Sequence, residues 1–426
     1  MYSMALHSFG KMNIKAAMLV PMLLLSMFTI APLVDSQVAP NIAKISPILL
    51  NEMANAGESV NVLIKTLTKD YSSVVEQIND LGGKVGFLFK YVTGLSASLP
   101  PSKIVELTQN KLVESIYYDD PVELSADQAQ DSMLYESPVV EEEYETVELA
   151  STEISSDELT NYWNTIGMGA QSIWPETNMG AGSLAVVIDS GIWTPHFMFA
   201  PKVALGEIVG GADVSRDNLA TYNLYPPTWP YNPKYFGWNN TNNYYHGSHC
   251  AGILAGRGSV IASPGTRLYI YARALELYSG TTLPTDGLGR KTISLLGMAP
   301  AASLYIVKIF DHTGASIPRG IIISAFEHVL DLKLVHGYDV DLLSMSFGGR
   351  ALFDGRDMYE QLIDLFTAND ITPVAAAGNL GPASMTGHTP GAAYTAITAG
   401  MASDPVHTRS YWDYYYLRPA GSPPGP

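Results

Sequence analysis

Three side chains of kinds found in enzyme active sites lie at the ends of predicted strands and helices. Asp189 and Asn379 each follow an apolar run, and His246 opens a segment of small residues that predicts a helix. An imidazole exchanges protons near neutral pH, a carboxylate can orient it, and an amide can donate to an oxyanion. Taken singly, an Asp or Asn at a strand end is more often a helix cap or a turn former.

The elements that must position these residues alternate between strand and helix from about residue 161 onward. We expect strands over 184–188, 303–309, 341–346 and 373–377, and helices over 246–255, 321–336 and 358–369. The strands are nearly continuous apolar runs, which is typical of a parallel sheet covered on both faces. The pattern predicts an α/β domain with a doubly wound parallel sheet, in which ligands bind beyond the carboxyl ends of the strands.

A smaller unit with a different pattern precedes this domain. We expect strands over 61–66, over two parts of 84–99 and over 112–118, with helices over 72–81 and 101–109. The order β-α-β-β-α-β is that of a small ferredoxin-like α+β unit. That fold alone says nothing about function.

The charge of the chain is unevenly distributed. The formal net charge is −17, and residues 119–158 carry fourteen acidic residues and no Lys or Arg. A run of like charges predicts a solvated, flexible linker, which we assign to residues 122–160. The sequence contains no basic patch that would indicate a nucleic-acid partner.

The N-terminus resembles an export signal. Lys11 and Lys15 precede an apolar run over 16–34, and small residues follow near Ser36. This pattern predicts a secretory signal peptide over 1–36 and a secreted or extracellular protein. The alternative is an uncleaved anchor that attaches the protein to the membrane or cell surface, because nineteen residues can just span a bilayer. The single cysteine, Cys250, excludes an intramolecular disulfide framework.

Five motifs in order resemble those of the subtilase family of serine proteases (peptidase S8). Asp189 lies in a D-S-G motif, and His246 begins H-G-S-H-C-A-G, close to the family's H-G-T-H-x-A-G. Residues 297–308 (GMAPAASLYIVK) and 375–379 (AAAGN) match two further family segments. Residues 344–349 (SMSFGG) match the family's N-M-S-L-G-G, with departures at the first and fourth positions.

The resemblance implies a subtilisin-like fold made as a precursor. Residues 37–121 would be the inhibitory propeptide domain with the ferredoxin-like fold, since 61–118 is similar to the subtilase propeptide. Residues 161–426 would be the catalytic domain, incomplete at its C-terminus. The implied partners are polypeptide substrates and the chain's own propeptide, acting as an intramolecular inhibitor.

The resemblance also implies roles for individual residues. His246 would be the general base, Asp189 would orient it, and Asn379 would donate to the oxyanion of the tetrahedral intermediate. Ser346, Phe347 and Gly348 would offer backbone groups to an extended substrate. No cofactor is required for the chemistry and no metal site is assigned; structural calcium is common in the family, but the sequence identifies no ligands for it.

Two neighbours of His246 offer alternative roles. His249 could be mistaken for the base, but in the family the first histidine of the motif is the catalytic one. Cys250 could be imagined as a nucleophile or a thiol sensor. Its position also takes Cys in the proteinase K-like branch of the family, where it is a small helix residue and not the nucleophile.

The family's G-T-S-M-A-x-P motif, which carries the nucleophilic serine, does not occur in the 426 residues. One interpretation is a fragment of a secreted serine endopeptidase whose serine lies beyond residue 426. The other is a catalytically inactive relic that binds peptides or acts as an inhibitor. Both interpretations remain open at this point.

Overall fold

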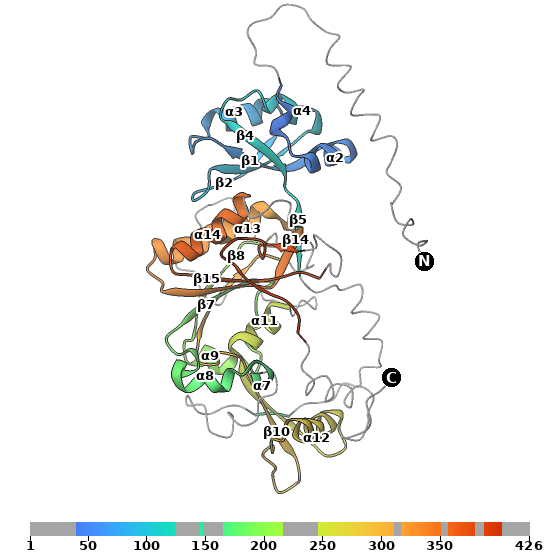
Figure 1. Ribbon diagram of the computed structural model, residues 1–426, viewed down its shortest axis with the longest axis vertical. Helices are drawn as coiled ribbons and strands as arrows, with labels where there is room; N and C mark the ends of the chain where they lie inside the picture. Colours follow the sequence, from blue (N-terminus) through green and yellow to red (C-terminus); the bar gives the residue numbers. More distant parts are fainter. Residues whose placement is uncertain are drawn as a thin grey trace, which may run out of the picture. The chain divides into compact units, whose positions relative to one another are not determined.

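The computed structural model describes residues 40–124, 145–147, 165–215, 246–310, 317–350, 357–379 and 387–402. The chain divides into two compact units (Figure 1). The first comprises Met1–Asp120 with Pro318–Gly320, and the second comprises Pro121–Ile317 with Ile321–Pro426.

The first unit has the predicted β-α-β-β-α-β order. Its four-stranded sheet has the order β2-β3-β1-β4, and β1 pairs antiparallel with both β3 and β4. The strands are β1 (Val60–Thr66), β2 (Lys84–Leu88), β3 (Gly94–Leu99) and β4 (Val113–Tyr118), and the helices are α3 (Ser72–Asp80) and α4 (Pro101–Leu107). A 3-10 helix, η1 (Ile42–Lys44), and a helix, α2 (Pro47–Asn55), precede β1 and were not predicted.

The added helix α2 has a clear physical basis. The Ser46 hydroxyl accepts a hydrogen bond from the Leu49 amide, and Pro47 occupies the first helical position, where no amide donor is needed. Leu49 is fully buried in the core of the unit. The short helix is therefore held by its cap and one buried side chain rather than by a long apolar stripe, which is why periodicity did not reveal it.

The second unit is built around a six-stranded sheet with the order β17-β15-β13-β7-β11-β8, in which every neighbouring pair is parallel. The strands are β7 (Leu184–Asp189), β8 (Ile208–Asp213), β11 (Ser303–Lys308), β13 (Val340–Met345), β15 (Thr372–Ala376) and β17 (Ile397–Ala399). All six residues of β7 are buried. The structure confirms the doubly wound parallel sheet and adds β8 and β17, which were not predicted.

Helices cover both faces of this sheet. Figure 1 shows α13 (Arg319–Leu334) and α14 (Met358–Ala368) on one face and α11 (His246–Ala255) on the other. The ring of Phe326 packs on Tyr359 at 5.0 Å and on Phe366 at 5.6 Å between ring centroids. The remaining short helices are α7 (Thr165–Met168), α8 (Ala170–Thr177), η2 (Asn178–Gly180) and α9 (Ala200–Ala204).

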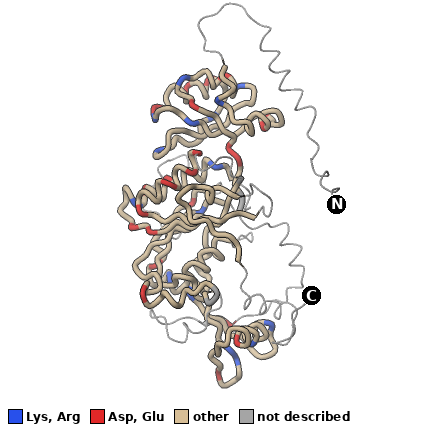
Figure 2. The backbone as a smooth tube through the Cα atoms, in the orientation of Figure 1, with Lys and Arg blue, Asp and Glu red and all other residues tan. Residues whose placement is uncertain are grey.

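A small lobe extends the second unit between α11 and β11. It consists of the antiparallel pair β9 (Arg257–Ala262) and β10 (Lys291–Leu296), with α12 (Arg267–Ser279) packed on them. Figure 2 shows both basic and acidic positions on this lobe, beside the label of α12 in Figure 1. Inside it, Lys291 Nζ lies 2.8 Å from Glu276 Oε1, with both side chains at most 10% exposed. No helix or strand was predicted over residues 257–296.

Two short strands overlap residues 122–160, the segment that was expected to be flexible. Strand β5 (Pro121–Leu124) pairs antiparallel with β14 (Phe347–Arg350), in a small sheet of order β12-β5-β14-β16 that includes β12 (Ile317–Pro318) and β16 (His388–Thr389). Strand β6 (Glu145–Val147) pairs antiparallel with β9. Average composition hides such strands, because pairing with a neighbouring strand requires only a few backbone donors and acceptors.

Within the described ranges, no helix is both long enough and apolar enough to cross a bilayer. The predicted signal segment, 1–36, lies outside these ranges.

The buried His328 on α13 makes the stability of the second unit sensitive to acid. Its Nε2 lies 2.9 Å from the Tyr305 hydroxyl, and burial lowers its pKa to about 4. The folded state therefore holds His328 neutral. As the pH falls from about 6.5 to about 4, the unfolded state binds a proton that the folded state does not, and the folded state is destabilised. We expect this residue to reduce the free energy of unfolding by roughly 3 kcal/mol over that range.

The measurement is denaturant unfolding of wild type and His328→Gln at pH 7 and pH 4. The free energy of unfolding should fall less on acidification in His328→Gln than in wild type. Tyr305→Phe keeps the buried imidazole, so its free energy of unfolding should fall as much as that of wild type. An equal acid loss in wild type and His328→Gln would contradict this account.

Candidate active site

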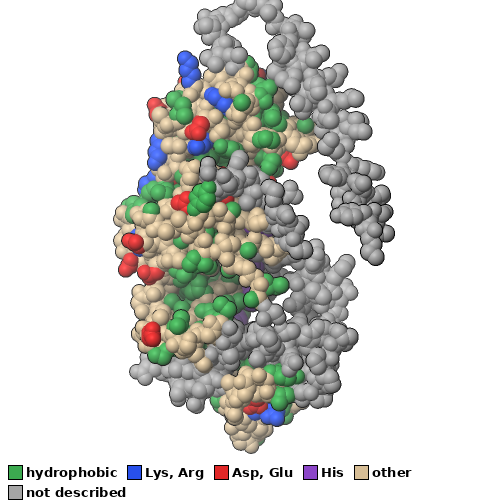
Figure 3. Space-filling model, in the orientation of Figure 1, with side chains coloured by type: hydrophobic (Ala, Val, Ile, Leu, Met, Phe, Trp, Pro, Cys, Tyr) green, Lys and Arg blue, Asp and Glu red, His purple; other side chains and the backbone are tan. Residues whose placement is uncertain are grey.

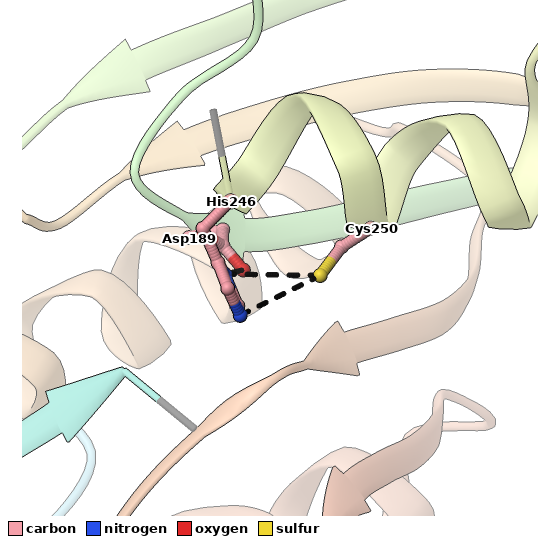
Figure 4. Close-up of side chains that lie close together, drawn as sticks. All are labelled: Asp189, His246 and Cys250. Atoms are coloured by element: carbon pink, nitrogen blue, oxygen red, sulfur yellow. Dashed lines mark hydrogen bonds and ion pairs between the residues drawn. The ribbon is translucent and has the colours of Figure 1, made fainter. Parts of the chain in front are cut away.

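Asp189 and His246 form a buried pair at the carboxyl end of β7. His246 Nδ1 donates to both carboxylate oxygens of Asp189, each at 2.9 Å (Figure 4). The Asp189 side chain is 1% exposed and that of His246 is 16% exposed. The Ser190 amide also donates to Asp189 Oδ1, at 2.6 Å. The carboxylate therefore keeps its acceptors occupied although it is removed from water.

The start of α11 can reach this carboxylate because residue 247 has no side chain. A Cβ at Gly247 would lie 2.1 Å from the Gly191 carbonyl oxygen, so no other residue fits without moving backbone. The Gly247 amide donates to Ser190 Oγ at 3.0 Å, and Gly191 adopts φ +96. The turn Asp189–Gly191 and the first residues of α11 thus fit each other directly.

The environment of His246 favours its protonated form. Burial alone would lower the pKa of His246, but the hydrogen bond and charge of Asp189, together with Cys250, raise it above its ordinary value of 6.5. Because Nδ1 donates to Asp189, the neutral ring carries its lone pair on Nε2. Nε2 is therefore the atom that can accept a proton from another group.

Cys250 lies one helical turn after His246. Its Sγ is 3.8 Å from His246 Nδ1 and 4.0 Å from Nε2, as the dashed lines in Figure 4 show. Among the described residues, Asp189, His246 and Cys250 are the one group whose side chains could hold a metal ion. Calcium takes oxygen ligands, so this set of one carboxylate, one imidazole and one thiol does not fit it.

His249 occupies a different environment from His246. It lines a cavity of about 520 Å³, together with Trp193, Ser248 and Ile253. Burial and the positive charge of His246 lower the pKa of His249. Among the described residues, the histidine that donates to Asp189 is His246.

The other predicted site residues follow neighbouring strands of the same sheet. Asn379 comes after β15, is exposed, and makes no hydrogen bond with the described residues. Ser346 connects β13 to β14. Phe347 and Gly348 lie on β14, opposite Leu124 and Glu123 of β5. The Phe347 side chain is fully buried, with its ring 5.9 Å from that of Phe310, so this residue can offer only its backbone.

Sequence reasoning missed three features of the site. These are the pairing of β5 with β14, the Ser190–Gly247 hydrogen bond and the closeness of Cys250 to the His246 ring. The alternation Pro121-Val122-Glu123-Leu124 and the four-residue spacing of His246 and Cys250 were the available signals. No sequence signal indicated the Ser190–Gly247 hydrogen bond, because it joins residues 57 apart and depends on tertiary packing.

Several proteins of known name are similar to this chain in sequence. The chain is 32% identical to pyrolysin of Pyrococcus furiosus over 196 residues, covering 43% of this chain and 13% of pyrolysin. It is 26% identical to the serine protease AprX of Bacillus subtilis over 233 residues, covering 54% of this chain and 40% of AprX. It is 24% identical to subtilisin E of Bacillus subtilis over 313 residues, covering 72% of this chain and 55% of subtilisin E. The chain thus spans between 13% and 55% of the length of these relatives.

Among solved structures, the crystal structure of fervidolysin from Fervidobacterium pennivorans, a keratinolytic enzyme related to subtilisin, matches with a TM-score of 0.47. The sequence identity is 17%, and the match covers 78% of this chain and 41% of fervidolysin. The model of the subtilase family matches residues 180–415, which is more than half of the 426 residues and includes Asp189, His246 and Asn379. This chain belongs to the subtilase family.

Proposed function

We propose that this chain is part of a secreted serine endopeptidase that is made as a zymogen, with its nucleophilic serine beyond residue 426. The observation that carries the proposal is the Asp189–His246 pair, with Nδ1 2.9 Å from both carboxylate oxygens, in a member of the subtilase family. The signal-like segment 1–36 supports export of the protein.

In the proposed mechanism, His246 acts as general base through Nε2. It takes the proton of the serine hydroxyl as that oxygen attacks the scissile carbonyl, and returns the proton to the leaving amine. Asp189 keeps the ring in this tautomer and stabilises the imidazolium that forms. The Asn379 amide donates to the oxyanion of the tetrahedral intermediate; in subtilisin such a donor is worth about 3–4 kcal/mol.

The proposed substrate is a polypeptide bound in extended form beside β14. Strand β5 pairs with β14 at Phe347 and Gly348, which supports recognition through backbone hydrogen bonds. Because the Phe347 side chain is buried, this part of the site would not select for substrate side chains through residue 347.

The proposed inhibitor is the segment that ends in β5. Residues 37–121 would be the propeptide domain, and β5 follows directly and occupies the backbone groups that a substrate would use. Val122 of β5 is fully buried. Cleavage after Leu124, within the predicted linker 122–160, would separate this strand from the protease.

A second candidate function is an inactive peptide-binding or inhibitor relic. The β5–β14 pairing favours it to the extent that binding an extended peptide needs no nucleophile. Peptide hydrolysis by the protein encoded by the complete gene separates the two candidates: a full-length protein that binds peptides but does not cleave them would support the relic.

The Asp189 carboxylate should control the titration of His246. With that charge removed, burial opposes only the contribution of Cys250, so we expect the pKa of His246 in Asp189→Asn to fall below its value in wild type. The Asp189–His246 pair stabilises the folded state fully below pH 6.5. This stabilisation is lost as the pH rises through the raised pKa of His246 in the folded state. NMR titration of the imidazole signals measures the pKa of His246 in wild type and in Asp189→Asn, with His196, whose pKa is lowered by burial alone, as the internal reference. An unchanged His246 pKa in Asp189→Asn would refute the assignment.

His246→Ala should abolish turnover in the protease that includes the serine. Removal of the base in subtilisin costs about two million-fold in kcat, and we expect a loss on the order of a million-fold here. His249→Ala is the matched control and should retain activity within about tenfold, since that side chain does not bond Asp189. A His249→Ala variant as inactive as His246→Ala would contradict the assigned base.

A separate polypeptide spanning residues 40–124 should inhibit the mature protease. The variant Val122→Asp buries an unpaired charge, and we expect it to weaken inhibition by at least about tenfold. Glu123→Gln is the control, because it changes a charge and leaves Val122 in place. Inhibition constants for the three polypeptides decide the matter, and equal constants for wild type and Val122→Asp would exclude β5 as the inhibitory strand.

A further inference from the structure

The small lobe of the second unit carries an additional strand taken from the acidic linker. Strand β9 pairs with β10 along one side, from Arg257–Leu296 to Ala262–Lys291. Along its other side it pairs with β6, in the register Glu145–Ile261, Thr146–Val260 and Val147–Ser259. The lobe therefore has the sheet order β10-β9-β6.

Described residues outside β6 form a core within the lobe. Its buried residues come from β9, α12, β10 and the loop at Leu283. The Lys291 ammonium reaches Glu276 Oε1 at 2.8 Å and the Thr285 hydroxyl at 3.0 Å, which ties β10 to α12. The outer edge of β9 would exist without β6, and it would then present unpaired backbone groups.

One ion pair matches the acidic character of the linker. Arg290 Nη1 lies 2.5 Å from Glu145 Oε2, and Arg290 Nε donates to Asp286 Oδ2 at 2.7 Å. Asp286 therefore fixes the guanidinium beside the edge of β9. Figure 3 shows charged side chains exposed on this lobe, next to hydrophobic ones. Because the pair is partly exposed, its main effect is to select an acidic residue and set the register.

We propose that the outer edge of β9, with Arg290, is a docking site for an extended acidic segment, occupied here by Glu145–Val147. Backbone pairing supplies the attachment and Arg290 supplies the preference for a carboxylate. Because β6 is a paired strand, it resists cleavage better than unpaired chain. A cut between Leu124 and Glu145 would leave the docked strand with the protease, and we expect the mature chain to begin in that interval. This second part rests on the proposed maturation.

Hydrogen exchange in the 426-residue chain tests the docking without any cleavage. Replacing residues 145–147 by Gly-Ser-Gly should speed amide exchange in β9 by at least about tenfold and leave β7 unchanged. A synthetic peptide spanning 141–150 should restore the protection. Unchanged exchange in β9 after the replacement would overturn the proposal, and unchanged exchange in β7 verifies that the variant is folded.

A charge exchange tests the preference for an acid. The same peptide carrying Glu145→Lys should bind the replaced chain at least about fivefold more weakly, and Arg290→Glu in the chain should reverse the order of the two peptides. Equal binding of both peptides would overturn the acidic preference.

N-terminal sequencing of the matured full-length protein tests the retention. A first residue before Glu145 is expected, and one after Val147 would overturn retention while leaving the exchange result standing. Absence of any cleavage would count against the proposed zymogen, not against the docking site.

Discussion

The buried carboxylate of Asp189 is the constraint on which this site depends. A carboxylate removed from water is costly unless hydrogen-bond donors surround it. Here the donors are the His246 ring and the Ser190 amide. To supply the ring, α11 must begin against the turn after β7, and Gly247 is what allows that approach. The chemistry of one side chain thus determines where a helix starts and which residue can follow its first position.

The acidic linker illustrates how composition and local structure can disagree. Fourteen acidic residues and no basic ones over 119–158 predict solvated chain. Two short strands nevertheless form within 121–147: β5 lies between β12 and β14 in one small sheet, and β6 adds to the edge of another. Each pairs with backbone groups that would otherwise be left unpaired. Such pairing depends on the surface that receives the strand, which cannot be read from the strand's own few residues.

Much of the fold could be predicted from the sequence, and the reasons are physical. The central strands of the second unit are continuous apolar runs because both faces of their sheet are covered. In the first unit, the spacing of apolar residues changes clearly between the strand period of two and the helix period of 3.6. The lobe of β9, β10 and α12 was missed because its core is small and partly held by the Lys291–Glu276 pair rather than by apolar periodicity. Asp189 and His246 could be found because their flanking motifs are specific, whereas the contact of Cys250 required the folded helix.

The position of β7 in the sheet has a consequence for synthesis of the chain. Its nearer partner in sequence, β11, begins 119 residues later, from Leu184 to Ser303, and its other partner, β13, is farther still. At translation rates of about 5–20 residues per second, roughly 6–24 seconds pass before β11 has been made. During that time this buried strand, apolar except for Asp189, has no native strand partner. A newly made chain must therefore shield β7 by other means, and this interval is when the protein is most exposed to misassociation.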